Sequence, residues 1–139
     1  MQKRLIIILL FVVNVVYAQK KPLDHSVYDT WEAVGSKQLS NNGTWAMYGV
    51  LQQEGDAQLY LTNLKTNAKL NIPRGLNAQF SNDSKFAAFN IRPFYKDIRQ
   101  AKIKKKKADE TPKDSLGIAN LTTNAITKIA RVKSFKFPE

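Results

Sequence analysis

A nine-residue segment occurs twice in this chain, and this repeat constrains the fold more than any other feature. Residues 40–48 read SNNGTWAMY and residues 81–89 read SNDSKFAAF, with starts 41 residues apart. Ser, Asn, a turn-forming pair, an aromatic residue, Ala and a closing aromatic residue follow in the same order in both copies. A repeat with a fixed period of this length is typical of repeat architectures, so it limits the folds that the chain can adopt.

A second pair of matched segments follows the first in each copy. Residues 59–72 read LYLTNLKTNAKLNI and residues 116–129 read LGIANLTTNAITKI. Both read as strand, turn and strand, with Thr66-Asn67 and Thr123-Asn124 at the hairpin tips. Two unrelated turn-and-strand segments would not share this internal order. Since a period of about 40 to 45 residues is typical of β-propeller blades, the sequence predicts an all-β, incomplete β-propeller of two antiparallel blades.

The repeated segment itself predicts a turn followed by a strand. Asn42-Gly43 and Asp83-Ser84 are pairs suited to tight reversal. The residues after them, 45–48 and 86–89, are apolar and aromatic, which predicts strands buried on both faces. We expect four aromatic residues to be core residues between neighbouring blades: Trp45, Tyr48, Phe86 and Phe89.

The N-terminus has the three parts of a secretory signal peptide. Lys3 and Arg4 precede an apolar run over 5–13, and Ala18 is the small residue before the expected cut. An uncleaved anchor is the alternative, but even the thirteen residues of 5–17, in which Asn14 is the one polar interruption, fall short of the roughly 30 Å hydrocarbon core at 1.5 Å each. We therefore predict a signal peptide over 1–18 and a mature protein exported to the periplasm or the extracellular space.

Residues 19–39 are predicted to be a lead-in segment with a short helix that places Val27 and Trp31 on one face. The chain has one histidine, His25, and no cysteine. A catalytic or metal-binding His25 would need partners that its surroundings lack, so an exposed structural role is favoured. The sequence predicts no catalytic, cofactor-binding or metal-binding residue and no cofactor.

Residues 40–139 are predicted to form the two blades, the second with an insertion at about 92–113. Leu64 and Leu121 are 57 residues apart, whereas the repeated segments are 41 apart, so the second blade holds 16 extra residues. From Arg92 to Lys107 there are eight basic residues against Asp97. This pattern predicts a basic, solvated helix over 95–108 at a hairpin tip, stopped before Pro112.

The charge of the insertion restricts the expected partners. If the basic run binds a partner, we expect a weak contact with an anionic envelope surface through Lys104, Lys105, Lys106 and Lys107. A solvated helix without a partner is favoured over this contact. Nucleic acid is not expected, because the aromatic residues precede the lysines and are not interleaved with them. Two blades cannot close a propeller, so unpaired strand edges favour self-association. A longer protein, assembly of two to four copies, or a small sandwich would each cover these edges, and a longer protein is favoured.

Three segments carry a resemblance to a known family. They read KPLDHSVYDTWEAV over 21–34, IPRGLNAQFSNDSKFAAF over 72–89 and AKIKKKKADETPKDSLGI over 101–118. With the exported N-terminus, they resemble the start of secreted prolyl oligopeptidase family serine peptidases of Bacteroidetes-like bacteria. The resemblance implies a propeller followed by an α/β-hydrolase domain with a Ser, Asp, His triad. It also implies a propeller that restricts access to a chamber, so that peptides are the substrates.

The sequence departs from that family in its catalytic part. It contains no G-x-S-x-G segment, and its one histidine precedes the candidate serines, opposite to the hydrolase order. The chain alone is therefore expected to have no peptidase activity. Three functions remain: the N-terminal propeller portion of a peptidase, a periplasmic propeller that scaffolds envelope proteins, and a small self-contained exported β protein. The first is favoured.

Overall fold

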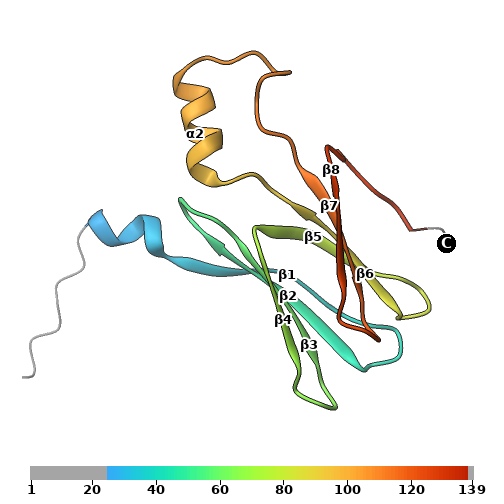
Figure 1. The fold of residues 1–139 in the computed structure, drawn as a ribbon. Helices are drawn as coiled ribbons and strands as arrows, with labels where there is room; N and C mark the ends of the chain where they lie inside the picture. The colour runs from blue at the N-terminus through green and yellow to red at the C-terminus, as the bar shows by residue number, and fades with distance from the viewer. Residues whose placement is uncertain (1–24, 138–139) are drawn as a thin grey trace, which may run out of the picture.

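Two separate four-stranded sheets make up most of the molecule. The structure is a computed structural model that describes residues 25–137, so the predicted signal peptide over 1–18 lies outside the described residues. Sheet A has the order β1-β2-β3-β4 and sheet B the order β5-β6-β7-β8, with antiparallel neighbours throughout (Figure 1). The strands are β1 (Glu32–Leu39), β2 (Trp45–Gln52), β3 (Gln58–Asn63), β4 (Lys69–Pro73), β5 (Gly75–Phe80), β6 (Phe86–Ile91), β7 (Ser115–Asn120) and β8 (Ile126–Ala130). The fold class predicted from the repeat, all-β with two antiparallel blades, is confirmed.

The first copy of the repeated segment forms a hydrogen-bonded turn between β1 and β2. The Ser40 hydroxyl donates to Asn42 Oδ1 at 2.8 Å and accepts from the Trp45 backbone N–H at 2.9 Å. Gly43 has a φ of 66°, a left-handed conformation that glycine adopts without strain. The predicted turn at Asn42-Gly43 is confirmed, and Ser40 is the residue that ties it to the strand.

The second copy makes the same bonds between β5 and β6. The Ser81 hydroxyl donates to Asp83 Oδ1 at 2.6 Å and accepts from the Phe86 backbone N–H at 3.0 Å. Ser84, in the place of the glycine, has a φ of 57°. The repeat is therefore a repeat of hydrogen-bond geometry and not only of residue types.

The hairpin tips repeat in the same way. Asn63 Oδ1 accepts hydrogen bonds from the backbone N–H groups of Lys65 and Thr66, at 2.9 and 3.1 Å. Asn120 Oδ1 accepts from the backbone N–H groups two and three residues further on, at the same distances. Asn67 and Asn124 each have a φ of 58°. Asparagine tolerates this conformation better than other non-glycine residues, which explains its place at both tips.

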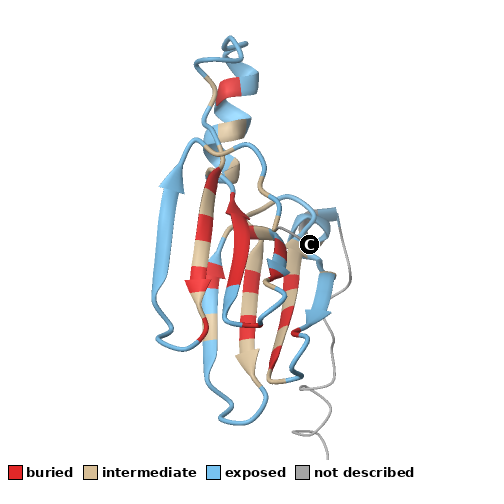
Figure 2. Cartoon of the chain, turned by 90° about the vertical axis from the view of Figure 1, so that its right-hand side faces the viewer, coloured by how far each residue is buried: buried red, intermediate tan, exposed pale blue. Residues whose placement is uncertain are grey.

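One apolar core lies between the two sheets. Residues of both sheets belong to it: Trp45, Met47, Leu59, Leu61, Ile72, Ala78, Phe80, Ala87, Phe89, Ile91, Ala119 and Leu121. Buried positions alternate with less buried ones along β2, β3 and β7, whereas β6 is buried from Ala87 to Ile91 (Figure 2). Gly75 brings β5 close to sheet A, since a Cβ there would lie 2.7 Å from the Leu59 Cβ.

The four expected core aromatics are not all buried. Trp45 and Phe89 are 4% and 0% exposed, as predicted. Tyr48 is half-buried on the outer face of sheet A, where it stacks on Tyr60 with centroids 5.2 Å apart. The prediction was wrong for Phe86, which is 38% exposed. Side chains of a strand alternate between its faces, and Phe86 lies on the face of β6 opposite to Phe89.

The first strand of each sheet was not predicted. β1 lies inside the predicted lead-in of residues 19–39, so sheet A begins at Glu32 and not at residue 40. β1 is exposed along nearly its whole length, and its polar sequence shows no apolar alternation. The sequence pattern predicts no strand over the residues of β5 either. Both strands contain a break in register, between Val34 and Lys37 and between Leu76 and Gln79, which hides a period of two.

The short predicted N-terminal helix is present as a 3-10 helix, η2 (His25–Thr30). Trp31 follows the helix and is 55% exposed. Its ring packs against Tyr28 at 4.8 Å between centroids. Trp31 therefore belongs to a small aromatic cluster at the surface and not to the core.

Helix α2 (Tyr95–Ile103) lies in the segment between β6 and β7 and projects from one end of the sheets (Figure 1). It ends earlier than the predicted Ala108. Lys104 caps its C-terminus, and Lys105 has a φ of 49°, which cannot continue a right-handed helix. Lys104 and Lys105 form a turn directly after the helix, and Lys106 and Lys107 lie in the irregular segment that follows. Among the residues that the structure describes, no helix is long and apolar enough to cross a membrane.

Candidate functional site

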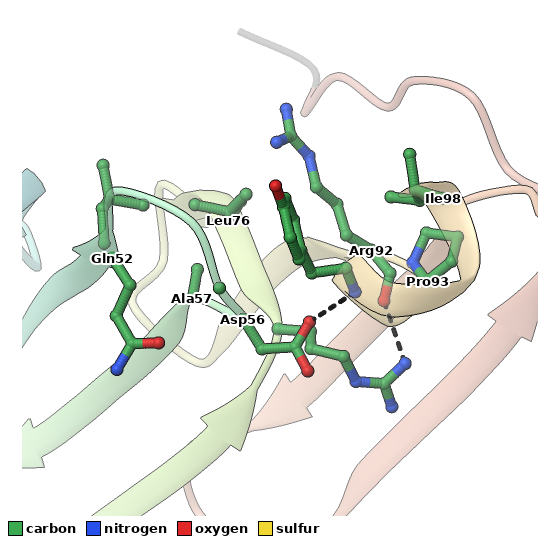
Figure 3. Close-up of a pocket in the computed structure, with 11 residues that line it drawn as sticks. Gln52, Asp56, Ala57, Leu76, Arg92, Pro93 and Ile98 are labelled. Atoms are coloured by element: carbon green, nitrogen blue, oxygen red, sulfur yellow. Dashed lines mark hydrogen bonds between the residues drawn. The ribbon is translucent and has the colours of Figure 1, made fainter. Parts of the chain in front are cut away.

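A small hollow lies where sheet A meets the basic insertion. It is a cavity of about 100 Å³. Its lining comes from the end of β2 and the β2–β3 connection, from the chain around the start of β5, and from the segment that leads from β6 into α2: Leu51, Gln52, Gly55, Asp56, Ala57, Arg74, Leu76, Arg92, Pro93, Tyr95 and Ile98 (Figure 3). We call it the junction pocket.

Asp56 fixes the start of α2 from across the junction pocket. Its carboxylate Oδ1 accepts a hydrogen bond from the Tyr95 backbone N–H at 2.7 Å (Figure 3). The first backbone N–H groups of a helix have no partner within the helix, and the residue at the cap, Phe94, supplies no side-chain acceptor. Asp56 therefore replaces the missing N-cap acceptor from a distant part of the chain. Its negative charge also interacts favourably with the positive end of the helix dipole.

Arg74 joins the two sheets at the floor of the same pocket. Its backbone N–H donates to the Ala57 carbonyl at 2.6 Å, and its φ is 63°. Its guanidinium Nη1 donates to the Arg92 carbonyl at 3.0 Å, and the guanidinium carbon Cζ lies 3.9 Å from the ring centroid of Phe94. A guanidinium over an aromatic face gains a cation–π attraction. Its Nε is buried with no hydrogen-bond partner among the described residues.

Glu54 holds the outer rim of the junction. Its carboxylate lies 3.2 Å from the Arg99 guanidinium of α2, and its backbone N–H donates to the Asp29 carbonyl of η2 at 3.2 Å. A hydrogen bond between the Tyr95 hydroxyl and the Glu54 carboxylate raises the pKa of Tyr95, because the neutral phenol is the better donor. η2, the β2–β3 connection and α2 are thus tied together through one residue.

The junction pocket holds neighbouring segments of the chain together through its polar groups. It is smaller than the roughly 300–1,000 Å³ of typical small-molecule sites. Its polar groups bond mostly to backbone atoms of neighbouring segments. Within residues 25–137, no group of three or more His, Cys, Asp or Glu side chains could hold a metal ion. His25 is exposed and meets Tyr28 edge to face at 5.1 Å between ring centroids.

Sequence reasoning named no site residue and did not find this junction. Asp56 and Tyr95 are 39 residues apart, and Glu54 and Arg99 are 45 apart. Neither pair has a local pattern that marks it. The one available signal was the placement of the insertion directly after β6, which brings its first residues back over the β2–β3 connection.

The basic run of the insertion lies apart from the junction's ion pair. Lys104, Lys105, Lys106 and Lys107 are all exposed. Two of them, Lys105 and Lys106, line an open hollow of about 610 Å³ between α2 and the returning chain, together with Pro112 and Asp114. Among the described residues, Arg99 and Lys85 form ion pairs, and none of these four lysines does.

Solved β-propeller structures share this arrangement of sheets. An acylaminoacyl peptidase in complex with Z-Gly-Gly-Phe-chloromethyl ketone is 14% identical, with a TM-score of 0.55 over 82% of this chain and 16% of its own. Pyrococcus horikoshii acylaminoacyl peptidase is 12% identical, with a TM-score of 0.56 over 84% of this chain and 17% of its own. The β-propeller domain of the Trilobed protease from Pyrococcus furiosus is 17% identical, with a TM-score of 0.52 over 77% of this chain and 30% of its own.

The similarity establishes the fold: sheets A and B are two blades of an unclosed β-propeller. The chain spans less than a third of the length of each of these proteins. No protein-family model matches the chain, and no curated protein matches it.

Proposed function

We propose that this chain is the N-terminal propeller portion of an exported serine peptidase of the prolyl oligopeptidase family. The observation that carries the proposal is the two-blade similarity to peptidase propellers, which covers about four fifths of the chain in two of them. The resemblance of residues 21–34, 72–89 and 101–118 to that family supports the same assignment independently. The role of the chain is to shape substrate access, with no chemistry of its own.

The coding sequence beyond Glu139 tests this proposal. Further blades followed by a G-x-S-x-G segment on a strand-to-helix turn are expected, since that turn exposes the nucleophile of an α/β-hydrolase. Further blades followed by a stop would instead favour a scaffold propeller. A protein assay complements the sequence: the 139-residue chain should neither cleave a proline-containing chromogenic peptide nor react with a serine-directed probe. Specific labelling of the chain by that probe would contradict its non-catalytic role.

Export is part of the proposal. The basic start, the apolar run over 5–13 and the small residue Ala18 support cleavage before Gln19. Expression of the full chain in a bacterial host, followed by fractionation and mass spectrometry of the N-terminus, tests it. A mature N-terminus at Gln19 in the periplasm or medium is expected, and an uncleaved cytoplasmic chain would reject it.

A weak contact with anionic envelope lipids through the four lysines at 104–107 is a secondary element of the proposal. Their charge and exposure support it, and salt should weaken it because such contacts are screened. The test compares vesicle binding of the parent with a variant that carries glutamine at all four positions. A matched control carries glutamine at Lys65, Lys69, Lys85 and Lys128 instead. Equal binding of both variants would remove the contact from the proposal.

A further inference from the structure

The C-terminus of α2 ends in a turn that fixes the backbone of two of the four successive lysines. The Lys106 backbone N–H donates to the Ala101 carbonyl at 3.0 Å. The Lys105 backbone N–H donates to the Lys102 carbonyl, also at 3.0 Å. With Lys104 as the C-cap and a φ of 49° at Lys105, these bonds form the Schellman motif, in which a left-handed residue closes the helix. Lys105 and Lys106 are therefore held against the last turn of α2.

This turn divides the lysine run into two halves with different surroundings. Lys105 and Lys106 line the open hollow between α2 and the returning chain, and Lys104 and Lys107 do not border it. Lys102, in the last turn of the helix, adds a third ammonium group to the same hollow. All three lysines are exposed, and in the part of the chain that the structure describes none of them forms an ion pair. We call this space of about 610 Å³ the arch hollow.

The floor of the arch hollow is apolar. Pro93, Ile98, Ala101 and Pro112 contribute to its lining. Ala101 is the one buried residue of α2, at 5% exposed. The volume of the hollow lies within the roughly 300–1,000 Å³ of typical ligand sites, which combine an apolar lining with a few polar groups that fix orientation. The arch hollow has both parts.

The returning chain supplies oxygen acceptors to the arch hollow. Thr111 and Asp114 line it from this side. The Thr111 hydroxyl donates to the Ala108 carbonyl at 2.7 Å, so its oxygen keeps acceptor capacity. The Asp114 side chain is half-buried and, within residues 25–137, forms no ion pair. The hollow therefore has ammonium donors along α2 and oxygen acceptors along the returning chain.

Contacts within the chain hold both walls of the arch hollow. At the start of α2, Asp56 accepts from the first helical backbone N–H and Glu54 pairs with Arg99. On the returning chain, the Lys113 ammonium donates to the Ala108 carbonyl and closes a local loop. Figure 1 shows α2 and this segment standing beyond one end of the sheets. Because the walls are already formed, a ligand does not have to order them on binding.

We propose that the arch hollow binds a short acidic peptide. Carboxylates of the peptide pair with Lys102, Lys105 and Lys106, and an apolar side chain between them covers the floor. Backbone N–H groups of the peptide donate to Thr111 and Asp114. Charge complementarity selects this occupant, because three ammonium groups border the hollow against one carboxylate. The inference uses residues of this chain alone and does not rest on the peptidase proposal.

An anionic lipid surface fits the arch hollow less well than a peptide. A flat charged surface attracts Lys104 and Lys107 as strongly as Lys105 and Lys106, since all four are exposed. It also leaves the apolar floor uncovered and brings negative charge towards Asp114. A peptide combines acidic side chains, an apolar side chain and backbone N–H donors in one segment. The mixed lining therefore favours a peptide.

Fluorescence anisotropy of a dye-labelled peptide, Glu-Glu-Leu-Glu-Glu, with the full chain tests the proposal. Lys105→Gln combined with Lys106→Gln should weaken binding by about tenfold, because two charge pairs are lost. The matched control combines Lys104→Gln with Lys107→Gln. It removes the same charge from the same run and should weaken binding by about twofold or less, since only screened, long-range attraction is lost. Lys102→Gln, which leaves the Schellman turn unaltered, should weaken binding by about threefold.

Two further measurements separate the arch hollow from general attraction to basic charge. A peptide with Gly in place of its Leu should bind about fivefold more weakly, because the floor is then left uncovered. Phosphatidylglycerol vesicles should bind the two double variants equally. Thermal unfolding of each variant checks that the fold is retained.

Four results would overturn the proposal. They are absence of peptide binding by the parent at low salt, equal losses in the two double variants, equal binding of the Leu and Gly peptides, and vesicle binding that falls only with Lys105→Gln and Lys106→Gln. The last result would assign the hollow to a lipid headgroup. None of these outcomes depends on further blades or on a hydrolase domain, so their failure leaves the peptidase proposal untouched.

Discussion

The hairpin tips of sheets A and B are nearly identical, whereas the corresponding faces of the two sheets differ in residue size and in burial. At the tips, Asn63 and Asn120 accept the same hydrogen bonds at the same distances, and Asn67 and Asn124 have the same φ. These hydrogen bonds are exposed, so each contributes about 0.5–1.5 kcal/mol, and the asparagine that accepts two of them is favoured at both tips.

The faces that correspond to one another show the opposite behaviour. Phe89 lies over Gly117 in sheet B, and Tyr48 stacks on Tyr60 in sheet A. One pair combines a large with a small residue under cover, and the other combines two large amphipathic residues on a half-exposed face. Apolar contacts can be refilled when the total volume fits the available space, whereas a directional hydrogen bond cannot. The repeat is therefore preserved in the hydrogen bonds of the turns, whereas the residues on each face vary with what packs against that face.

The largest expected effect is on the buried aromatic of sheet B. Phe89→Ala leaves a cavity in the core between the sheets, and it should lower the free energy of unfolding by about 3–5 kcal/mol. Phe86→Ala, on the open face of the same strand, should cost about 1 kcal/mol or less, since its ring is already 38% exposed. Urea unfolding followed by tryptophan fluorescence measures both. Equal losses would mean that the two faces of sheet B are equally covered in solution.

The next effect concerns the two strand glycines that face different surroundings. Gly117→Ala would place a Cβ 2.1 Å from the Phe89 ring and should cost about 1–3 kcal/mol as an overpacked core site. Gly49→Ala is the matched control, because the nearest atoms to its Cβ are 4.0 Å away. Its free energy of unfolding should change little or rise slightly. A neutral Gly117→Ala would show that Phe89 can leave this position without loss.

The repeat made the strands β2, β3, β6 and β7 predictable, because their apolar residues and the turn residues beside them are local signals. β1 and β5 were missed for a local reason too, since both contain a register break that interrupts the period of two. The burial of individual aromatics was not predictable from the repeat. Phe86 matches Trp45 in sequence, but only Trp45 has a sheet packed on its face.

The junction pocket could not be predicted, because its contacts join distant segments. The hydrogen bond from Tyr95 to Asp56 depends on how the insertion returns over the β2–β3 connection. Neither residue has a neighbour in sequence that indicates the contact. The end of α2 was also misjudged, since the left-handed Lys105 breaks a helix that propensity alone would continue to Ala108.

A smaller effect should separate the two repeated turns. Ser40→Ala removes the acceptor of the Trp45 backbone N–H in a buried turn, and it should cost about 1–2 kcal/mol. Ser81→Ala removes the equivalent bond to Phe86 in a turn that water reaches, so its loss should be about half as large or less. Thermal unfolding of both variants measures the difference. A larger loss for Ser81→Ala would contradict the view that only the sheet A turn is covered.

The smallest effect is a pH dependence present in one turn and absent from the other. The Ser81 hydroxyl and the Lys85 backbone N–H donate to Asp83 and lower its pKa below the usual 3.8, while neutral Asn42 accepts the same bonds in the first turn. A lowered folded-state pKa contributes stability that is present above the unfolded value and is lost as the pH falls through the folded one. Asp83→Asn should therefore remove a small part of the decline in unfolding midpoint below about pH 4, and Asn42→Asp should add one. The exposed Lys85–Asp83 ion pair at 3.8 Å is screened by water, so added salt should change neither result much. If both variants followed the parent's pH profile, the carboxylate and the amide would be interchangeable in these turns at every pH, and the second turn would differ from the first only in its cover.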